Sequence, residues 1–255
     1  MEFILKNNIL SPKLNSNKIT SAEVLEWFEK IEETNQNNKS WIDHCKCVGN
    51  SAAAIAKILN LDTDKAKTLG YLHDIGIYTN NEEEYLKHPR HVINGFNYLK
   101  SLGLDEEYAN ICLTHSFLKN DINCVAGGGF KNLTPEEITM VDEFIKNHEY
   151  TYYEKIINLC DLICTNITMT MDERLLDLLK RRAKKGQSIY IDENTLYHIK
   201  EAYQLKQDID GILGFNVYNL FTDVDKNQED EGKEELAKAI GCNIKDILPT
   251  DVRFF

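Results

Sequence analysis

The chain has 255 residues, of which 42% are hydrophobic, and a formal net charge of −12. This length allows one large domain or two small ones, and the apolar share is ordinary for a globular protein. The excess of acidic residues argues against nonspecific binding to nucleic acid or to an anionic membrane surface.

The composition favours an all-α protein, because leucine, isoleucine, lysine and glutamate abound and only four prolines occur. We find no alternating strand pattern and no run of about 18 apolar residues, so neither a sheet nor a membrane span is predicted. The seven cysteines are odd in number and lack a disulfide-framework spacing, which predicts free thiols in a reducing cytoplasm. We expect one domain over 1–255, with its core at about 20–180 and a C-terminal helical extension at about 190–255.

Two helices are predicted at the start of the core. Thr20 and Glu23 form a capping box, followed by apolar residues at helical spacing. A second helix is predicted from about Ser40 to Leu59, with alanines in its apolar face that allow close packing. His44 lies near the start of this helix and close to its inward face.

The third predicted helix begins at Asp62 or Thr63 and ends at the pair His73-Asp74. Neighbouring side chains on a helix point about 100° apart, so this pair can reach one point only where the helix ends. Gly76 predicts such an end, because glycine permits a left-handed residue after a helix.

A polar linker at 80–84 leads to a fourth predicted helix, which His88-Pro89 opens and Gly103 terminates. His91 and Gly95 lie four residues apart on one face of this helix. The proline biases His88 itself out of the helix, which disfavours it as a metal ligand.

A fifth predicted helix begins at about Asp105 and carries His115 one turn beyond Ile111. Residues 119–132 include three consecutive glycines and predict a long loop beside a functional site. Three further helices are predicted next: one starting at Thr134, one over 153–165 with Asp161 among apolar residues, and one starting at the capping box Thr170–Glu173. One or two helices follow over 194–221, with a possible bend near Gly211 and Gly214. An acidic, mobile stretch at 223–232 and a short helix over 234–240 complete the prediction.

Four residues in this order resemble the signature of the HD superfamily of metal-dependent phosphohydrolases, and residues 73–76 read literally His-Asp-Ile-Gly. The four are His44, His73, Asp74 and Asp161. The resemblance covers roughly 40–180 and implies an all-helical HD domain in which they surround a metal. His91 and His115 resemble the two additional histidines of the subset that binds two metals, which includes enzymes that symmetrically cleave diadenosine tetraphosphate and cyclic-dinucleotide phosphodiesterases.

Imidazole and carboxylate ligands together suit divalent iron, manganese, cobalt, nickel or zinc. Asp74 has two carboxylate oxygens and could bridge two ions, so it is the predicted catalytic residue. The predicted ligands of one ion are His44, His73 and Asp161, and those of the other are His91 and His115. Two ions about 3.5–4 Å apart can share a hydroxide that attacks a phosphoryl group.

Three cations flank these ligands, and each could hold a substrate phosphate or be an ordinary surface charge: Lys46, Arg90 and Lys119. His148 and His198 lie in polar surroundings and are predicted at the surface. The basic run at 180–185 predicts a solvated helix face.

Two departures from the family pattern narrow the expected substrate. Ile77 follows Gly76, where cyclic-dinucleotide phosphodiesterases and many diadenosine tetraphosphate hydrolases carry lysine. The Gly-Tyr-Pro motif of the phosphodiesterases is absent after His115. These differences argue against cyclic diguanylate hydrolysis and leave the exact substrate open.

The predicted function is hydrolysis of a phosphoester or phosphoanhydride bond in a small phosphorylated molecule, with a nucleotide favoured. Two other hypotheses stay open: an oxygenase holding two irons on the same six ligands, and a non-enzymatic metal-binding sensor or scaffold. The sequence indicates no oligomeric state.

Overall fold

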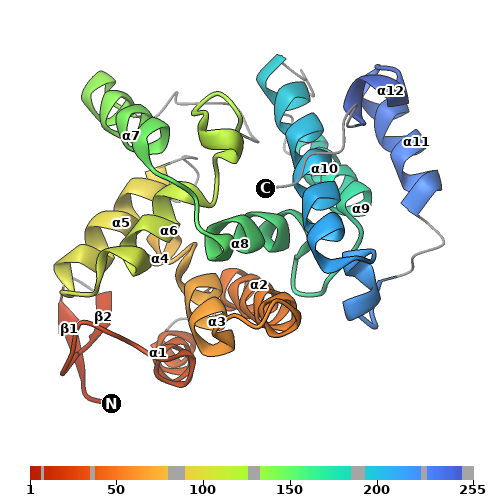
Figure 1. Cartoon of the computed structure of the whole chain (residues 1–255). Coiled ribbons are helices and arrows are strands. Elements are labelled where there is room, and N and C mark those ends of the chain that lie inside the picture. Colours follow the sequence, from red (N-terminus) through yellow and green to blue (C-terminus); the bar gives the residue numbers. More distant parts are fainter. Residues whose placement is uncertain are drawn as a thin grey trace.

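The computed structural model describes residues 1–6, 9–34, 38–79, 90–125, 133–184, 193–224 and 229–248. Within these ranges the protein is all-α, as predicted, apart from a small antiparallel sheet (Figure 1). Strand β1 (Phe3–Lys6) pairs with β2 (Ile9–Pro12), with Phe3 opposite Pro12. The expectation of no strands is therefore wrong at the N-terminus, because strands of four residues are too short to show a clear alternation.

The helices follow in chain order. They are α1 (Ser21–Thr34), α2 (Lys39–Ile58), α3 (Thr63–Leu72), α4 (Gly76–Thr79), α5 (Arg90–Ser101), α6 (Glu106–Thr114), the 3-10 turn η2 (Leu118–Asn120), α7 (Pro135–Asn147), α8 (Tyr152–Ile163), α9 (Met171–Lys184), α10 (Glu193–Leu213), the 3-10 turn η3 (Val217–Leu220), α11 (Glu229–Ile240) and α12 (Ile244–Ile247).

Side-chain caps fix the start of several helices where the sequence predicts them. The Asp62 carboxylate accepts from the backbone of Lys65 at the start of α3, and Thr134 forms a capping box with Glu137 at the start of α7. Thr170 caps α9 in the same way through its hydroxyl. Each cap satisfies backbone N–H groups that the first turn of a helix leaves without partners.

Helix α2 packs against α3 and α8, and α5 packs against α4 and α6 (Figure 1). One large apolar cluster lies between these helices and extends from Ile19 to Ile247. The C-terminal helices contribute Ile199 and Tyr218 to the same cluster, so they share a core with the first half of the chain. A second, smaller cluster lies between α5, α6 and α7 around Phe117.

Gly76 has a different role from the one predicted. The described glycines with a positive φ are Gly103, Gly214 and Gly241, and Gly76 instead begins α4. A Cβ on Gly76 would overlap the carbonyl oxygen of His91 and lie 2.6 Å from the amide nitrogen of Gly95. The missing side chain therefore allows α4 to approach α5 closely, a tertiary contact that local sequence does not reveal.

Gly76→Ala is expected to lower the free energy of unfolding by about 1–3 kcal/mol, the usual cost of overpacking, and to displace the segment that carries His91. Denaturant unfolding measures the first effect, and the metal content of the folded variant measures the second. Gly103→Ala is a control for the metal content: a Cβ there meets nothing within 4 Å, so the strain of its positive φ (+77°) should lower stability without changing the bound metal. A Gly76→Ala protein with wild-type stability and metal content would contradict the close-packing role.

The C-terminal region corrects two expectations. Helix α10 runs through Gly211 as one segment and ends at Leu213, directly before Gly214, whose φ is +76°. The stretch 223–232 was predicted to be mobile, but its last four residues, from Glu229, form the start of helix α11. Residues 225–228 lie outside the described residues.

The surface prediction is wrong for His198, which is only 3% exposed. His148 is half-buried and lies 2.7 Å from a carboxylate oxygen of Glu154. His88, the linker at 80–84 and residues 126–132 of the predicted loop lie outside the described residues. Lys180, at the start of the basic run, is exposed.

All seven cysteines are free thiols, as predicted. Among the described residues, no helix is both long and apolar enough to cross a membrane.

Candidate metal centre

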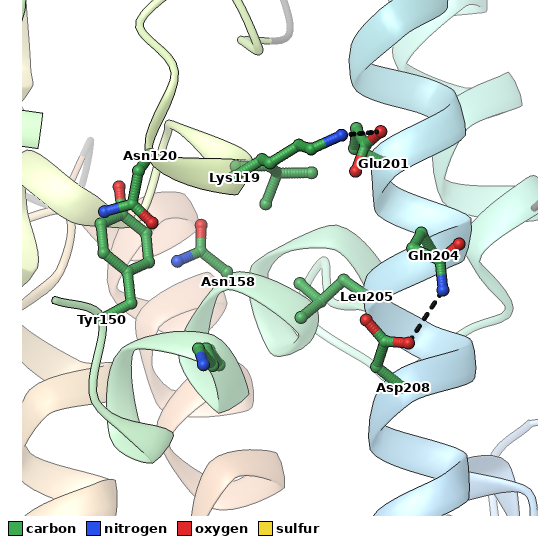
Figure 2. A pocket seen from close by; sticks show the side chains of 10 residues that line it. Lys119, Asn120, Tyr150, Asn158, Glu201, Gln204, Leu205 and Asp208 are labelled. Atoms are coloured by element: carbon green, nitrogen blue, oxygen red, sulfur yellow. Dashed lines mark hydrogen bonds and ion pairs between the residues drawn. The ribbon is translucent and has the colours of Figure 1, made fainter. Parts of the chain in front are cut away.

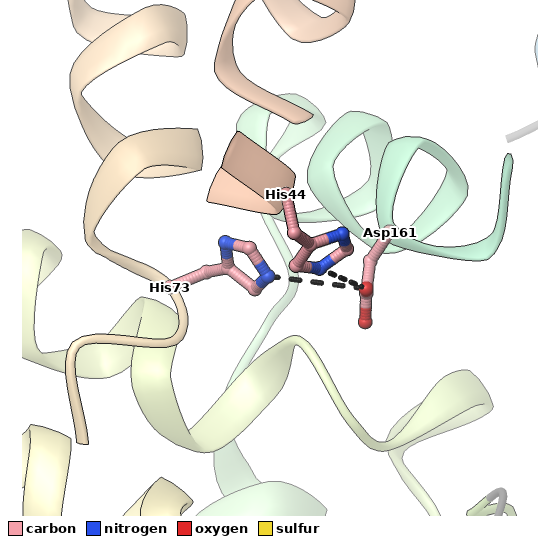
Figure 3. A group of neighbouring side chains, drawn as sticks. All are labelled: His44, His73 and Asp161. Carbon is pink, nitrogen blue, oxygen red and sulfur yellow. Dashed lines mark ion pairs between the residues drawn. The ribbon is translucent and has the colours of Figure 1, made fainter. Parts of the chain in front are cut away.

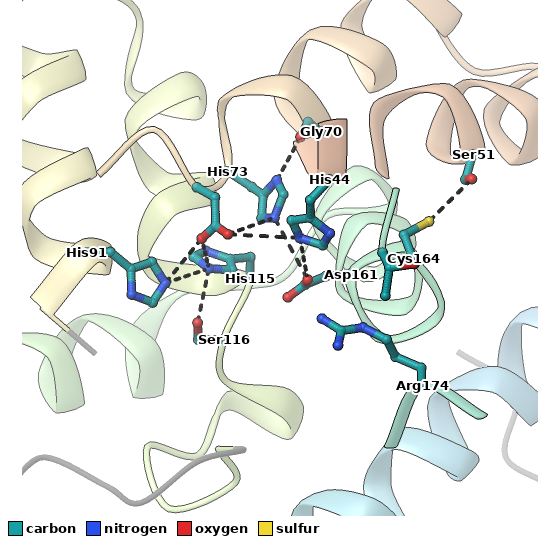
Figure 4. Close-up of polar contacts among 12 residues, drawn as sticks. His44, Ser51, Gly70, His73, His91, His115, Ser116, Asp161, Cys164 and Arg174 are labelled. Atoms are coloured by element: carbon teal, nitrogen blue, oxygen red, sulfur yellow. Dashed lines mark hydrogen bonds and ion pairs between the residues drawn. The ribbon is translucent and has the colours of Figure 1, made fainter. Parts of the chain in front are cut away.

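The six predicted ligands come from five separate segments and meet at one place in the fold (Figure 4). In chain order they are His44 near the start of α2, His73 and Asp74 in the turn between α3 and α4, His91 in the first turn of α5, His115 directly after α6, and Asp161 near the end of α8. The turn after α3 lets the neighbouring His73 and Asp74 point into the same space, as the sequence predicted.

The six side chains form two groups, each of which could hold one metal ion. The first is His44, His73 and Asp161 (Figure 3), and the second is Asp74, His91 and His115. Within each group the candidate ligand atoms all lie within 4.8 Å of one another. These are imidazole nitrogens and carboxylate oxygens, the donor set of first-row divalent ions.

Asp74 faces both groups. Its Oδ1 lies 3.2 Å from His91 Nε2 and 3.3 Å from His115 Nε2. Its Oδ2 lies 3.9 Å from His44 Nε2 and 3.7 Å from His73 Nε2. One carboxylate oxygen is therefore directed toward each group, which is the arrangement that a bridging ligand requires.

His73 is oriented as a metal ligand would be. Its Nδ1 donates a hydrogen bond of 2.7 Å to the carbonyl oxygen of Gly70, which leaves the lone pair on Nε2. Nε2 is buried and has no hydrogen-bond partner among the described residues. Burial lowers the pKa of His73 to about 4, so the ring is neutral and available to a cation. This buried acceptor without a partner supports the fit of a metal ion to the first group.

His115 is held in a similar way. Its Nδ1 lies 3.1 Å from the carbonyl oxygen of Ile111, and its Nε2 is directed toward Asp74. The Ser116 hydroxyl also lies 3.0 Å from Nε2. A backbone carbonyl on one ring nitrogen fixes the tautomer that presents the other nitrogen as a ligand.

The charges of the centre are strongly coupled. Burial disfavours the charged form of Asp74 and of Asp161, but the surrounding histidines have the larger combined effect and hold the pKa of both carboxyl groups below the usual range. Burial also disfavours the charged form of the two histidines. Nearby Asp161 nevertheless raises the pKa of His44, and nearby Asp74 raises the pKa of His115. His44 and His115 therefore keep a proton to higher pH than an ordinary histidine does.

Metal affinity is expected to fall as the pH is lowered from about 8 to 5.5, across the range in which histidines titrate. The raised pKa values of His44 and His115 mean that these rings keep a proton to higher pH, and each must lose it to bind a metal. Competition with a metal-binding dye at several pH values measures this effect. An affinity that stays constant over the range would contradict the assignment of these histidines as ligands.

The three cations predicted to hold phosphate each contact a glutamate instead. Lys46 Nζ lies 3.1 Å from Glu32, Arg90 NH1 lies 2.8 Å from Glu137, and Lys119 Nζ lies 2.9 Å from Glu201. These contacts do not test binding of a substrate, so the phosphate role of the three residues stays a prediction.

Lys119 lines a pocket between η2, α8 and α10 (Figure 2). Asn120, Tyr150, Asn158 and Asp208 also lie in its wall, and none of the six candidate ligands does. Lys119 therefore belongs to a cavity with a different lining from that of the metal centre.

Arg174, on α9, is a functional candidate that the sequence reading missed. Its side chain is 12% exposed and extends toward Asp161 (Figure 4). Its positive charge opposes protonation of His44, a smaller effect than those of burial and Asp161. Arg174 also lies 3.5 Å from Asp177. The sequence pointed to Arg174 only indirectly. The capping box at Thr170 predicts a helix soon after the one that carries Asp161, and Arg174 lies in the first turns of that helix.

Comparison with known proteins adds one finding. A family model described as "HD domain" matches residues 41–166, a range that includes all six candidate ligands and excludes Arg174. No curated protein and no solved structure matches the chain.

Proposed function

Because the chain carries an HD domain over residues 41–166, we propose that it is a metal-dependent hydrolase of phosphoester or phosphoanhydride bonds. The observation that carries this proposal is the position of Asp74 between two groups of potential metal ligands. Two ions can stabilise both the attacking and the leaving oxygen of a phosphoryl group, whereas one ion alone does not provide this arrangement. We further propose that the substrate is a small phosphorylated molecule, with a nucleotide favoured.

The residues present suit two divalent ions of iron, manganese, cobalt, nickel or zinc. Such ions, when bound, lower the pKa of a coordinated water and neutralise negative charge on phosphoryl oxygens. The chain itself supplies orientation: Gly70 and Ile111 fix the rings of His73 and His115 through their carbonyl oxygens. Asp74 and Asp161 supply the negative charge that balances the ions.

Arg174 is the residue we propose to hold the phosphate of the substrate. A phosphate carries negative charge into a protein with a net charge of −12, so local positive charge is needed beside the ions. The guanidinium of Arg174 is close enough to His44 to affect its protonation, and it can donate two parallel hydrogen bonds to a phosphate.

Arg174→Gln is expected to lower kcat/KM about 10- to 100-fold, since a charge-assisted hydrogen bond to phosphate contributes roughly 1.5–3 kcal/mol. Arg174→Lys should recover part of the loss, because it keeps the charge without the planar donor geometry. Steady-state kinetics and metal content are measured together.

Lys46→Gln, Arg90→Gln and Lys119→Gln are matched controls in the same assay. Each removes a cation that contacts a glutamate, and each tests the phosphate role predicted for that residue. Wild-type kinetics in a folded Arg174→Gln protein would contradict the role of Arg174, and a large loss in one of the other variants would assign the role to that residue.

The experiment that tests the proposed function is a screen of nucleotides and generic phosphoesters with protein loaded separately with each divalent metal. Release of phosphate or of a shortened nucleotide supports hydrolysis. Oxygen consumption by the iron-loaded protein without phosphate release would favour the oxygenase. Metal binding with neither activity would favour a sensor or scaffold.

A further inference from the structure

Two cysteines lie next to the candidate metal centre, one on the helix that carries His44 and one directly after the helix that carries Asp161. Cys47 is on α2, three residues after His44, and Cys164 is the residue that ends α8, three residues after Asp161. The two helices pack directly against each other. The proposed hydrolysis uses neither thiol.

The two sulfurs share one small polar cluster. Cys47 Sγ lies 3.7 Å from Thr168 Oγ1, Cys164 Sγ lies 3.5 Å from Ser51 Oγ, and the two hydroxyl oxygens lie 3.1 Å apart. The Cys164 thiol also donates a hydrogen bond to the sulfur of Cys47. Cys47 is partly exposed and Cys164 is buried, so solvent reaches this pair from one side.

We propose that Cys47 and Cys164 form a reversible disulfide by exchange with a small-molecule disulfide such as glutathione disulfide. This modification site is distinct from the metal ligands, and its formation does not depend on the hydrolase activity.

The two thiols are suited to different steps of the exchange. The hydrogen bond from Cys164 is the largest influence on Cys47 and lowers its pKa to about 7, while burial raises the pKa of Cys164. A partly exposed thiol with a lowered pKa is the attacking group in thiol–disulfide exchange. Cys47 is therefore the first to react, and Cys164 resolves the intermediate.

The exchange is balanced. The Cys47 thiolate attacks one sulfur of glutathione disulfide, a mixed disulfide forms, and one glutathione thiolate leaves. Cys164 then gives up its proton and attacks the Cys47 sulfur, which forms the Cys47–Cys164 bond and releases the second glutathione. Two protein thiols are oxidised and one glutathione disulfide is reduced to two glutathiones.

The other cysteines are less suited to this reaction. Cys45, Cys112 and Cys160 are fully buried, and burial raises the pKa of each thiol. Cys124 is also buried, Cys242 is half-buried, and burial raises the pKa of both thiols. Among the seven thiols, only Cys47 combines access to solvent with a lowered pKa.

The bridge is expected to disturb the nearer metal site. A disulfide requires two sulfurs about 2.05 Å apart, closer than any contact between thiols, so its formation moves α2 relative to the end of α8. Metal ligands tolerate changes of only about 0.2 Å in distance. The ion held by His44, His73 and Asp161 should therefore bind more weakly after oxidation.

The full chain, loaded with manganese, is incubated with glutathione disulfide and compared with reduced protein. The expected result is loss of two of the seven thiols, a mass about 2 Da lower, and one cross-linked peptide pair containing Cys47 and Cys164, all reversed by dithiothreitol. Bound manganese should fall by about one equivalent per chain. Cys164→Ser should stop at a stable mixed disulfide on Cys47, and Cys47→Ser should not react.

Cys242→Ser is the matched control and should form the bridge like the wild type. The proposal is overturned if the wild type retains seven thiols, if glutathione remains attached to wild-type Cys47, or if the cross-link joins another pair. A Cys47–Cys164 bridge with unchanged manganese content would overturn the link to the metal centre. None of these outcomes requires hydrolase activity, so failure here is distinguishable from failure of the proposed function.

Discussion

Replacing Asp74 with alanine should reduce phosphoester hydrolysis about a thousandfold or more, since loss of even one preorganised electrostatic contact costs roughly 10²–10³ in rate. The effect should exceed that of any other single substitution. Asp74 directs one carboxylate oxygen toward His91 and His115 and the other toward His44 and His73. Its removal therefore affects both candidate ion sites at once.

The test requires folded protein, because Asp74 also balances the charge of the surrounding histidines. Circular dichroism and the melting temperature establish folding, and turnover is then measured with saturating metal. Asp43→Ala is the matched control, since Asp43 lies next to His44 on α2 but contacts Lys39 instead of the centre. Near-normal turnover by folded Asp74→Ala would show that the two-ion proposal is wrong.

His115→Ala and His44→Ala should each lower bound metal from about two equivalents to about one, but from different sites. His115 belongs to the group of Asp74 and His91, and His44 belongs to the group of His73 and Asp161. Turnover should also fall in both variants, but less than in Asp74→Ala. Elemental analysis after gel filtration measures the stoichiometry, and the melting temperature is recorded on the same samples.

The competing interpretation is that His115 is a core residue held by the carbonyl of Ile111. In that case His115→Ala would lower the melting temperature and leave the metal content unchanged. Unchanged stoichiometry in both His91→Ala and His115→Ala would reduce the site to the first group and Asp74. His148→Ala is a suitable histidine control, because His148 contacts Glu154 and neither ligand group.

The sequence predicted the features of this protein that depend on local chemistry. The helix starts at Asp62, Thr134 and Thr170 follow from capping side chains within three residues of the groups they bind. The six candidate ligands were found from the sequence because they match an ordered motif, and the family match covers all of them. Their role as metal ligands stays a prediction.

The features that were missed depend on contacts between distant segments. Gly76 is required for the approach of α5, and no local pattern records that contact. His198 lies in a polar stretch of sequence, yet packing of α10 buries it. Arg174 reaches the centre from a helix beyond the matched domain. Spacing along one helix cannot indicate which side chains a second helix brings beside it.

The most direct test of the proposed metal-dependent hydrolysis is a metal titration of the metal-free protein, with turnover and melting temperature measured at each step. We expect no hydrolysis after chelation and long dialysis, and activity that rises until about two equivalents are bound per chain. We also expect a lower melting temperature without metal, because ions that join five segments stabilise the folded state. Full activity in the presence of excess chelator would contradict metal-dependent hydrolysis.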